Sequence, residues 1–128
     1  MNSETVSTPP TILVAEDEAL MLKMLTHRLQ KEGYRVVTAT DGKQALDSLR
    51  TSAPDLVITD LMMPYHNGLE IIEFVRKNLR PDLPVIVLSS AGQESSVVRA
   101  FDLGADDFAV KPFSPNELMS RVRKHLGR

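Results

Sequence analysis

The sequence has no cysteine, which excludes disulfide bonds and thiolate chemistry. That composition suits a reducing cytosol, although exported proteins can lack cysteine too, and we predict a cytoplasmic protein. No apolar run approaches the roughly 20 residues that a membrane-spanning helix needs. The opening segment, MNSETVSTPP, also lacks the basic and apolar regions of a secretory signal. We therefore expect no membrane partner.

A large excess of charge of one sign is also missing. The formal net charge is −2, so nothing in the charge balance favours binding to nucleic acid or to an anionic membrane. Hydrophobic residues make up 42% of the chain and charged residues 25%, as in an ordinary globular protein. A length of 128 residues fits one domain with one core.

Residues 1–10 are predicted to form a disordered polar lead-in, which Pro9 and Pro10 end. From residue 11 to residue 126, short apolar runs alternate with amphipathic stretches. The predicted strands are 12–15, 34–38, 56–60, 85–88 and 108–110. The predicted helices are 18–32, a short helix from residue 42, 68–79, a helix around Val97, Val98 and Phe101 that Gly104 ends, and 115–126.

The apolar runs of the third and fourth predicted strands are continuous rather than alternating. Such runs are typical of a parallel sheet covered on both faces. Right-handed connections then place helices on both sides, which predicts an α/β fold with a doubly wound five-stranded parallel sheet. In such sheets ligands bind at the carboxyl ends of the strands.

Acidic residues stand where the first and third strands end. Glu16 and Asp17 follow the first strand and Asp60 ends the third. If these strands are neighbours, three carboxylates share one crevice, where each pair of like charges costs roughly 4 kcal/mol. Relief comes from a proton or a bound cation, and Mg²⁺, which prefers oxygen ligands, is the natural cation.

A hydroxyl and an ammonium group follow two further strands, Ser89 after the fourth and Lys111 after the fifth. Taken singly, each residue also has an ordinary interpretation, as a helix cap, a turn residue or a surface lysine. Their joint placement at four strand ends is what favours function. Metal, ammonium, hydroxyl and carboxylate are the parts of a phosphoryl-transfer site with a carboxylate nucleophile.

Four segments carry a resemblance to a known family. They are VAEDE at residues 14–18, DLVITDLMMP at 55–64 with Gly68 beyond it, PVIVLSS at 84–90 and GADDFAVKPF at 104–113. The chain resembles the receiver domain of two-component response regulators from about residue 11 to residue 126. The resemblance implies a flavodoxin-like receiver fold with strand order 2-1-3-4-5.

The resemblance also implies roles for individual residues. Asp60 is the expected phosphoacceptor, with Ser89 as the switch hydroxyl and Lys111 as a contact of the phosphoryl oxygens. The expected metal ligands are Asp17, Glu16 mainly through water, Asp60 and the backbone carbonyl of Met62, whose side chain we expect to fill the core. The expected switch elements are Phe108, in place of the tyrosine of many relatives, and a cis peptide bond before Pro112.

The expected function is a phosphoacceptor signalling domain that catalyses only its own phosphorylation and dephosphorylation. Its expected partner is a histidine kinase or a phosphotransfer protein. Phosphorylation is expected to change the surface around the fourth helix, fifth strand and fifth helix, and to promote a homodimer in which Arg121 reaches Asp107 of a partner chain.

One question about output stays open, and the residues disfavour two rival classes of protein. The chain is either a free-standing relay or the receiver part of a DNA-binding transcriptional regulator. A metal-dependent aspartyl phosphatase is a different class, but that class places its nucleophile after the first strand, with a second Asp two residues later. A flavin-binding module of the same topology would need a phosphate-binding loop after the first strand, where the acidic AEDEA segment repels phosphate.

Overall fold

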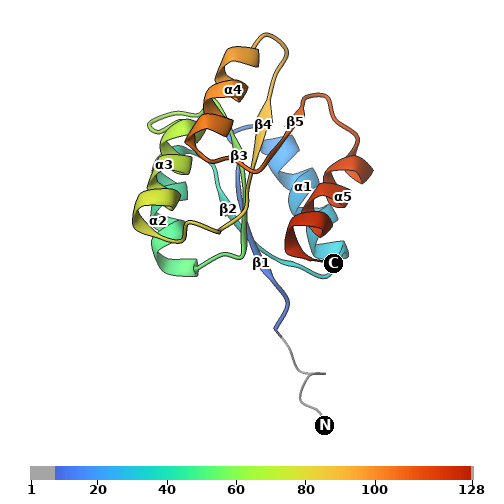
Figure 1. The fold of residues 1–128 in the computed structure, drawn as a ribbon. Coiled ribbons are helices and arrows are strands. Elements are labelled where there is room, and N and C mark those ends of the chain that lie inside the picture. The colour runs from blue at the N-terminus through green and yellow to red at the C-terminus, as the bar shows by residue number, and fades with distance from the viewer. Residues whose placement is uncertain (1–7, 128) are drawn as a thin grey trace.

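The computed structural model describes residues 8–127, in which five strands alternate with five helices (Figure 1). In chain order the elements are β1 (Thr11–Ala15), α1 (Ala19–Lys31), β2 (Arg35–Ala39), α2 (Gly42–Ser52), β3 (Leu56–Asp60), α3 (Gly68–Asn78), β4 (Val85–Ser89), α4 (Glu94–Leu103), β5 (Asp107–Val110) and α5 (Pro115–Leu126). Most of the predicted disorder falls on residues 1–7, which lie outside the described residues. Within the described range, no helix is long and apolar enough to cross a bilayer.

All strand pairs are parallel, and the order across the sheet is β2-β1-β3-β4-β5. The predicted doubly wound sheet is therefore confirmed. Helices α1 and α5 cover one face, and α2, α3 and α4 cover the other (Figure 1). Since β1 lies directly beside β3, the acidic ends of these two strands meet, as the site prediction requires.

The core explains why β3 and β4 have continuous apolar runs. Every residue of both strands is buried. Alternate side chains enter different cores: Val57 belongs to the core that α2, α3 and α4 cover, whereas Ile58 belongs to the core that α1 and α5 cover. Both faces thus bury apolar area, and each buried Å² stabilises the fold by about 25 cal/mol.

Local sequence signals determine where the helices beside the strand ends begin. Ser114 caps α5 by accepting a hydrogen bond from the backbone N–H of Glu117, as its sequence predicts. Asn67 and Glu70 cap α3 reciprocally. Gly68 begins α3 against the end of β3, where a Cβ atom would lie 2.4 Å from the carbonyl oxygen of Asp60. This close approach requires glycine and fixes the backbone behind Asp60.

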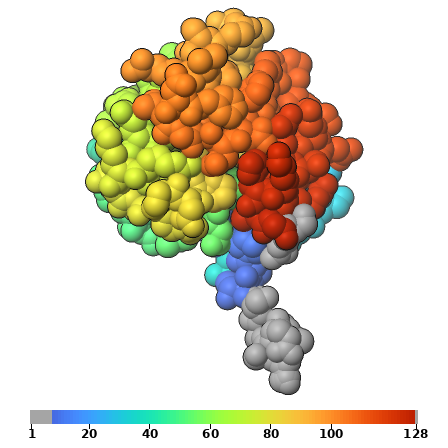
Figure 2. All heavy atoms as spheres, viewed as in Figure 1, coloured from blue at the N-terminus to red at the C-terminus, as the bar shows by residue number. Residues whose placement is uncertain are grey.

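Helix α4 differs from the prediction in the face that it buries. Of the three expected anchors, only Val97 packs against the core, while Val98 is 62% exposed and Phe101 is 41% exposed. The buried stripe instead runs through Val97, Ala100 and Leu103. The Phe101 ring meets Phe108 edge-on, with centroids 5.8 Å apart. As a result, α4 carries apolar side chains that are exposed to solvent. Figure 2 shows the segment that contains this helix, in orange, on the face turned toward the viewer.

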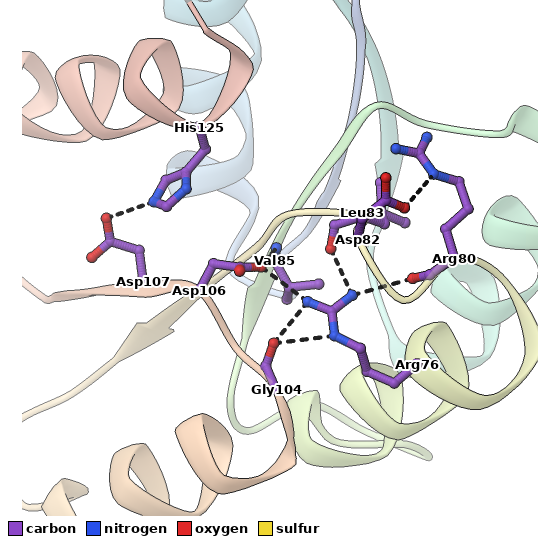
Figure 3. Close-up of polar contacts among 9 residues, drawn as sticks. All are labelled: Arg76, Arg80, Asp82, Leu83, Val85, Gly104, Asp106, Asp107 and His125. Carbon is purple, nitrogen blue, oxygen red and sulfur yellow. Dashed lines mark hydrogen bonds and ion pairs between the residues drawn. The ribbon is translucent and has the colours of Figure 1, made fainter.

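One arginine fixes the connection between α4 and β5. The guanidinium of Arg76 donates hydrogen bonds to the carbonyl oxygens of Gly104 and Leu83, both at 2.7 Å (Figure 3). It also pairs with Asp106 at 2.9 Å, and the same carboxylate accepts from the backbone N–H of Val85. These contacts tie the end of α4 to α3 and to the start of β4.

Candidate functional site

The carboxyl ends of the strands enclose a pocket of about 340 Å³. Its residues come from the segments after β1, β3, β4 and β5, which are adjacent because the sheet is parallel. The lining residues are Glu16, Asp17, Glu18, Asp60, Met62, Ser90, Gln93 and Lys111. The structure thus brings the predicted acidic residues and the predicted lysine into one pocket.

The three carboxylates differ in their exposure to solvent. Glu16 is completely buried and Asp60 nearly so, whereas Asp17 is exposed at the pocket entrance. One oxygen of each lies within 4.8 Å of the other two. Within residues 8–127, this is the one cluster of acidic, histidine or cysteine side chains with a geometry suited to a metal ion. An all-oxygen set with an exposed member suits Mg²⁺, which keeps several waters when bound.

Lys111 lies between the two buried carboxylates. Its Nζ is 2.9 Å from Glu16 Oε1 and 3.0 Å from Asp60 Oδ1. Burial alone would lower the pKa of Lys111, but the hydrogen bonds to Glu16 and Asp60 raise it above its ordinary value, so the ammonium stays charged. One positive charge therefore faces two carboxylates that are both shielded from water.

A proton removes the negative charge of the second carboxylate, that of Asp60. Burial, followed by the hydrogen bond with Glu16, raises the pKa of Asp60 to about 8. Burial acts the same way on Glu16, but hydrogen bonds from Asp60 and Lys111 outweigh it and lower the pKa of Glu16. In the metal-free protein the ionised carboxylate is thus Glu16, and Asp60 holds the proton that a cation would displace.

This arrangement predicts a pH-dependent stability. Because the folded state raises the pKa of Asp60 from 3.8 to about 8, the folded protein binds more protons than the unfolded chain between these values. The free energy of unfolding of the metal-free protein should therefore fall as pH rises through this window and level off above it. Urea denaturation across the window measures the slope.

Two further measurements test whether Asp60 is the group that causes this pH dependence. Asp60→Asn should flatten the slope, because the amide does not titrate. Added Mg²⁺ should reverse it, because the cation binds the ionised carboxylates and stabilises the folded state more as pH rises. An unchanged slope in Asp60→Asn would show that another group causes the pH dependence.

Ser89 ends β4 with an unused hydrogen-bonding group. The residue is 2% exposed, and its Oγ has no hydrogen-bond partner within the described part of the chain. A buried hydroxyl without a partner costs free energy, so the Ser89 hydroxyl is a candidate contact for a ligand. The backbone N–H of Lys111 donates to the Ser89 carbonyl at 2.7 Å, which holds the ends of β4 and β5 together.

The remaining predicted site residues have clear positions. The Lys111–Pro112 peptide bond is cis, as expected. Phe108 is half-buried on β5, beside a groove that Ser89 and Val98 also line. Met62 lies at the rim of the acidic pocket with its side chain 60% exposed, so its expected role as a core filler is wrong. The turn after β3 carries it away from the core.

Asp107 and Arg121 do meet, but within one chain. Arg121 Nη1 lies 2.7 Å from Asp107 Oδ1, and His125 Nε2 lies 3.0 Å from the other oxygen (Figure 3 shows the His125 contact). Burial opposes ionisation of Asp107, but the hydrogen bonds from His125 and from the Phe108 backbone lower its pKa. Within one chain the pair is internal, because one helical turn of α5 separates Arg121 from His125 and both lie over β5. The reach of Arg121 to Asp107 of a partner chain stays a prediction.

Sequence reasoning missed Gln93, which lines the pocket from the start of α4. Its Oε1 accepts a hydrogen bond from the backbone N–H of Ser90 at 2.7 Å. A glutamine in a polar loop has no chemical signature of its own, so only the fold indicates its proximity to Asp60. The nearest available signal was Gly92, whose φ of +91° marks the tight turn between the two residues.

Fold and site together define a doubly wound α/β protein with an acidic, lysine-containing pocket. Comparison with protein families gives the assignment: residues 12–123 match the response regulator receiver domain. The match covers most of the chain, and the protein belongs to this family, as the sequence resemblance predicted. It is accordingly a two-component signalling domain rather than a conventional enzyme.

Individual relatives agree with this assignment. The chain is 42% identical over 123 residues to "Probable transcriptional regulator ycf27" of Guillardia theta, covering 96% of this chain and 48% of the relative. It is 38% identical over 117 residues to the alkaline phosphatase synthesis transcriptional regulatory protein PhoP of Bacillus subtilis (strain 168), covering 91% and 48%. The chain therefore spans about half the length of these relatives.

A solved structure gives the same result in three dimensions. The BeF3-activated DrrB receiver domain superposes with a TM-score of 0.85 and 34% sequence identity, covering 94% of this chain and 100% of that domain. The strand order and the covering helices described above are thus those of a receiver domain.

Proposed function

We propose that Asp60 accepts a phosphoryl group from a histidine kinase or a phosphotransfer protein, in a reaction that requires Mg²⁺. The observation that carries the proposal is the buried Asp60 carboxylate, with Lys111 Nζ at 3.0 Å and the unpartnered Ser89 hydroxyl in the same region. A phosphoryl group on Asp60 supplies the acceptor oxygens that this hydroxyl lacks.

The donor set fits a magnesium ion. Glu16, Asp17 and Asp60 provide clustered carboxylate oxygens, and the Met62 carbonyl is the proposed fourth protein ligand. Bound Mg²⁺ would neutralise the negative charge of the carboxylates and of the incoming phosphoryl group. Asp17, the exposed member, is the proposed direct ligand, and buried Glu16 the one that acts mainly through water.

The residues of the chain divide the chemistry between them. An ionised Asp60 oxygen forms a bond to phosphorus while the bond from phosphorus to the donor histidine nitrogen breaks, and that nitrogen keeps the electron pair. Lys111 remains charged and faces the phosphoryl oxygens. The Ser89 hydroxyl donates a hydrogen bond to one of these phosphoryl oxygens. Dephosphorylation is a separate hydrolysis: a water oxygen forms a bond to phosphorus while the bond from phosphorus to the Asp60 oxygen breaks, Asp60 leaves as a carboxylate, and the proton of the water passes to the released phosphate or to solvent. The domain thus catalyses its own phosphorylation and dephosphorylation and does not turn over another substrate.

The test uses the purified protein and a small phosphoryl donor such as acetyl phosphate. Intact-mass analysis should show one added phosphoryl group in Mg²⁺ and none after chelation with EDTA. Reduction of the adduct with borohydride, followed by peptide mapping, should place it on Asp60. Equal labelling in EDTA, or an adduct on another residue, would contradict the proposal.

The output of the domain is a separate proposal. Because the curated relatives are transcriptional regulators twice the length of this chain, we propose that it is the receiver part of a DNA-binding regulator, with the free-standing relay as the alternative. Any DNA contact would then belong to the other part, since this domain is weakly acidic. Family membership also supports the predicted cytoplasmic location.

We further propose that phosphorylation promotes a symmetric homodimer through α4, β5 and α5. This face carries the exposed side chains of Val98, Phe101 and Val110 beside the Asp107–Arg121 pair. Exchanging that internal pair for the same pair between chains leaves the number of ion pairs unchanged, so it adds little to the free energy of association. Apolar packing must therefore supply most of the association energy.

Light scattering in Mg²⁺ with fluoroberyllate, a phosphoryl mimic, should show a doubled mass. Val98→Asp should keep the protein monomeric, whereas Gln30→Asp, an exposed change on α1, should not. A monomer at every accessible concentration, or equal dimerisation of both variants, would reject this face as the interface.

A further inference from the structure

The loop between β4 and α4 is closed by a reciprocal pair of hydrogen bonds. The backbone N–H of Ser90 donates to the side-chain Oε1 of Gln93 at 2.7 Å. The backbone N–H of Gln93 donates back to the Ser90 carbonyl at 3.2 Å. Gly92 makes this turn possible with a φ of +91°, a conformation that other residues rarely adopt.

Both residues of this pair face the phosphoryl site. Ser90 and Gln93 line the same pocket as Asp60 and Lys111. The strand register explains the proximity: Asp60 lies opposite Leu88, so the chain after β4 passes beside the end of β3.

A phosphoryl group on Asp60 has three oxygens that need donors. Lys111 can supply one hydrogen bond and the Ser89 hydroxyl another, because its Oγ has no partner among residues 8–127. The Ser90 N–H is the next donor after the end of β4, but it already donates to Gln93 Oε1. Anionic acceptors form stronger hydrogen bonds than an amide oxygen, so a phosphoryl oxygen can displace Gln93.

We propose that Gln93 is a positioning residue that withholds the Ser90 amide in the resting domain and competes with the phosphoryl group for it. This inference rests on the proposed phosphorylation of Asp60. Phosphorylation exchanges one acceptor of the Ser90 N–H for another and releases the Gln93 side chain at the start of α4. Gln93 thereby lowers the affinity of the pocket for a phosphoryl group. It also couples the binding of that group to a change at the first residues of α4.

The experiment measures the dissociation constant of fluoroberyllate in saturating Mg²⁺ for two variants with opposite expected effects. Gln93→Ala frees the Ser90 N–H and should strengthen binding by roughly two- to tenfold, the equivalent of one neutral hydrogen bond. Gln93→Glu should weaken binding, because a carboxylate holds the amide more tightly and repels the anion.

Gln44→Ala is the matched control. Gln44 Oε1 accepts the backbone N–H of Thr40 at 2.8 Å, the same kind of side-chain contact, in the loop between β2 and α2. Gln44 does not line the Asp60 pocket. Its loss should leave fluoroberyllate binding unchanged. The affinity for Mg²⁺ alone should change little in Gln93→Ala, because Gln93 is not among the clustered carboxylates.

Amide hydrogen exchange of Ser90 gives a second readout. In the free protein this amide should exchange faster in Gln93→Ala than in the wild type, and fluoroberyllate should protect it in both. If Gln93 had only a structural role, both Gln93 variants would bind fluoroberyllate more weakly. That result, or unchanged fluoroberyllate binding in Gln93→Ala, overturns this inference and leaves the proposed function standing. A wild type that binds no fluoroberyllate overturns the proposed function and this inference with it.

Discussion

Replacing Asp60 by Asn should abolish phosphoryl uptake completely. The amide keeps the size and shape of the carboxylate but is a far weaker nucleophile, and it removes one negative charge from the proposed metal site. Since Asp60 is 6% exposed and enclosed by Glu16 and Lys111, no neighbouring group can take its place in line with the donor without rearrangement. Intact-mass analysis after incubation with acetyl phosphate and Mg²⁺ measures the loss.

The matched control is Asp82→Asn, which makes the same chemical change at an exposed aspartate that pairs with Arg80. It should be labelled like the wild type. Thermal denaturation should show that Asp60→Asn is folded and, near pH 8, at least as stable as the wild type, because one buried carboxyl no longer has to ionise. An adduct of equal yield on Asp60→Asn would reject Asp60 as the phosphoacceptor.

Replacing Lys111 by Met should damage both stability and chemistry. Methionine has a similar length but no charge, so two shielded carboxylates lose their shared cation. Breaking a buried ion pair in this way costs about 3 kcal/mol at pH values above the pKa of Asp60. The cost should be smaller at lower pH, where Asp60 is protonated. Removing a preorganised charge from the reaction site should also slow phosphoryl uptake roughly 10²-fold.

Urea denaturation at two pH values and the rate of adduct formation measure these effects. Lys77→Met is the control, because Lys77 is an exposed lysine that pairs with Glu73 on the surface of α3. Its stability should stay within about 0.5 kcal/mol of the wild type. Mg²⁺ should restore part of the stability of Lys111→Met by replacing the missing positive charge. Equal stability of the two variants would show that Lys111 contributes nothing to holding Glu16 and Asp60.

The sequence alone determined the fold and the principal residues of the site. Continuous apolar runs at β3 and β4 indicated a sheet buried on both faces, because only apolar side chains are stable on both faces of such a strand. Parallel strands align their carboxyl ends at one edge of the sheet, and the strand order that the family resemblance implied places the ends of the first and third strands side by side. That is why Glu16, Asp60 and Lys111 could be predicted to share a pocket from their positions in the chain.

Only the tertiary structure decided the contacts that depend on the exact rotation and spacing of packed elements. Helix α4 buries Ala100 rather than Val98, because its rotation is set by the surface of β4 and α3 and not by its own apolar pattern. Asp107 bonds to Arg121 and His125 of its own chain, since α5 lies across β5 at hydrogen-bonding distance.

The same physical reason explains which parts of the proposed phosphoryl site could be predicted from the sequence and which could not. Asp60 could be predicted from the sequence because it ends one of four strands that are followed or ended by carboxylates, a hydroxyl and an ammonium group. Two hydrogen-bonding details could not be predicted: that the Ser89 hydroxyl has no partner within residues 8–127, and that the Ser90 amide donates to Gln93. Whether such a hydrogen bond forms depends on distances of a few tenths of an ångström. Those distances are fixed when the sheet and helices pack together, and the order of residues does not encode them locally.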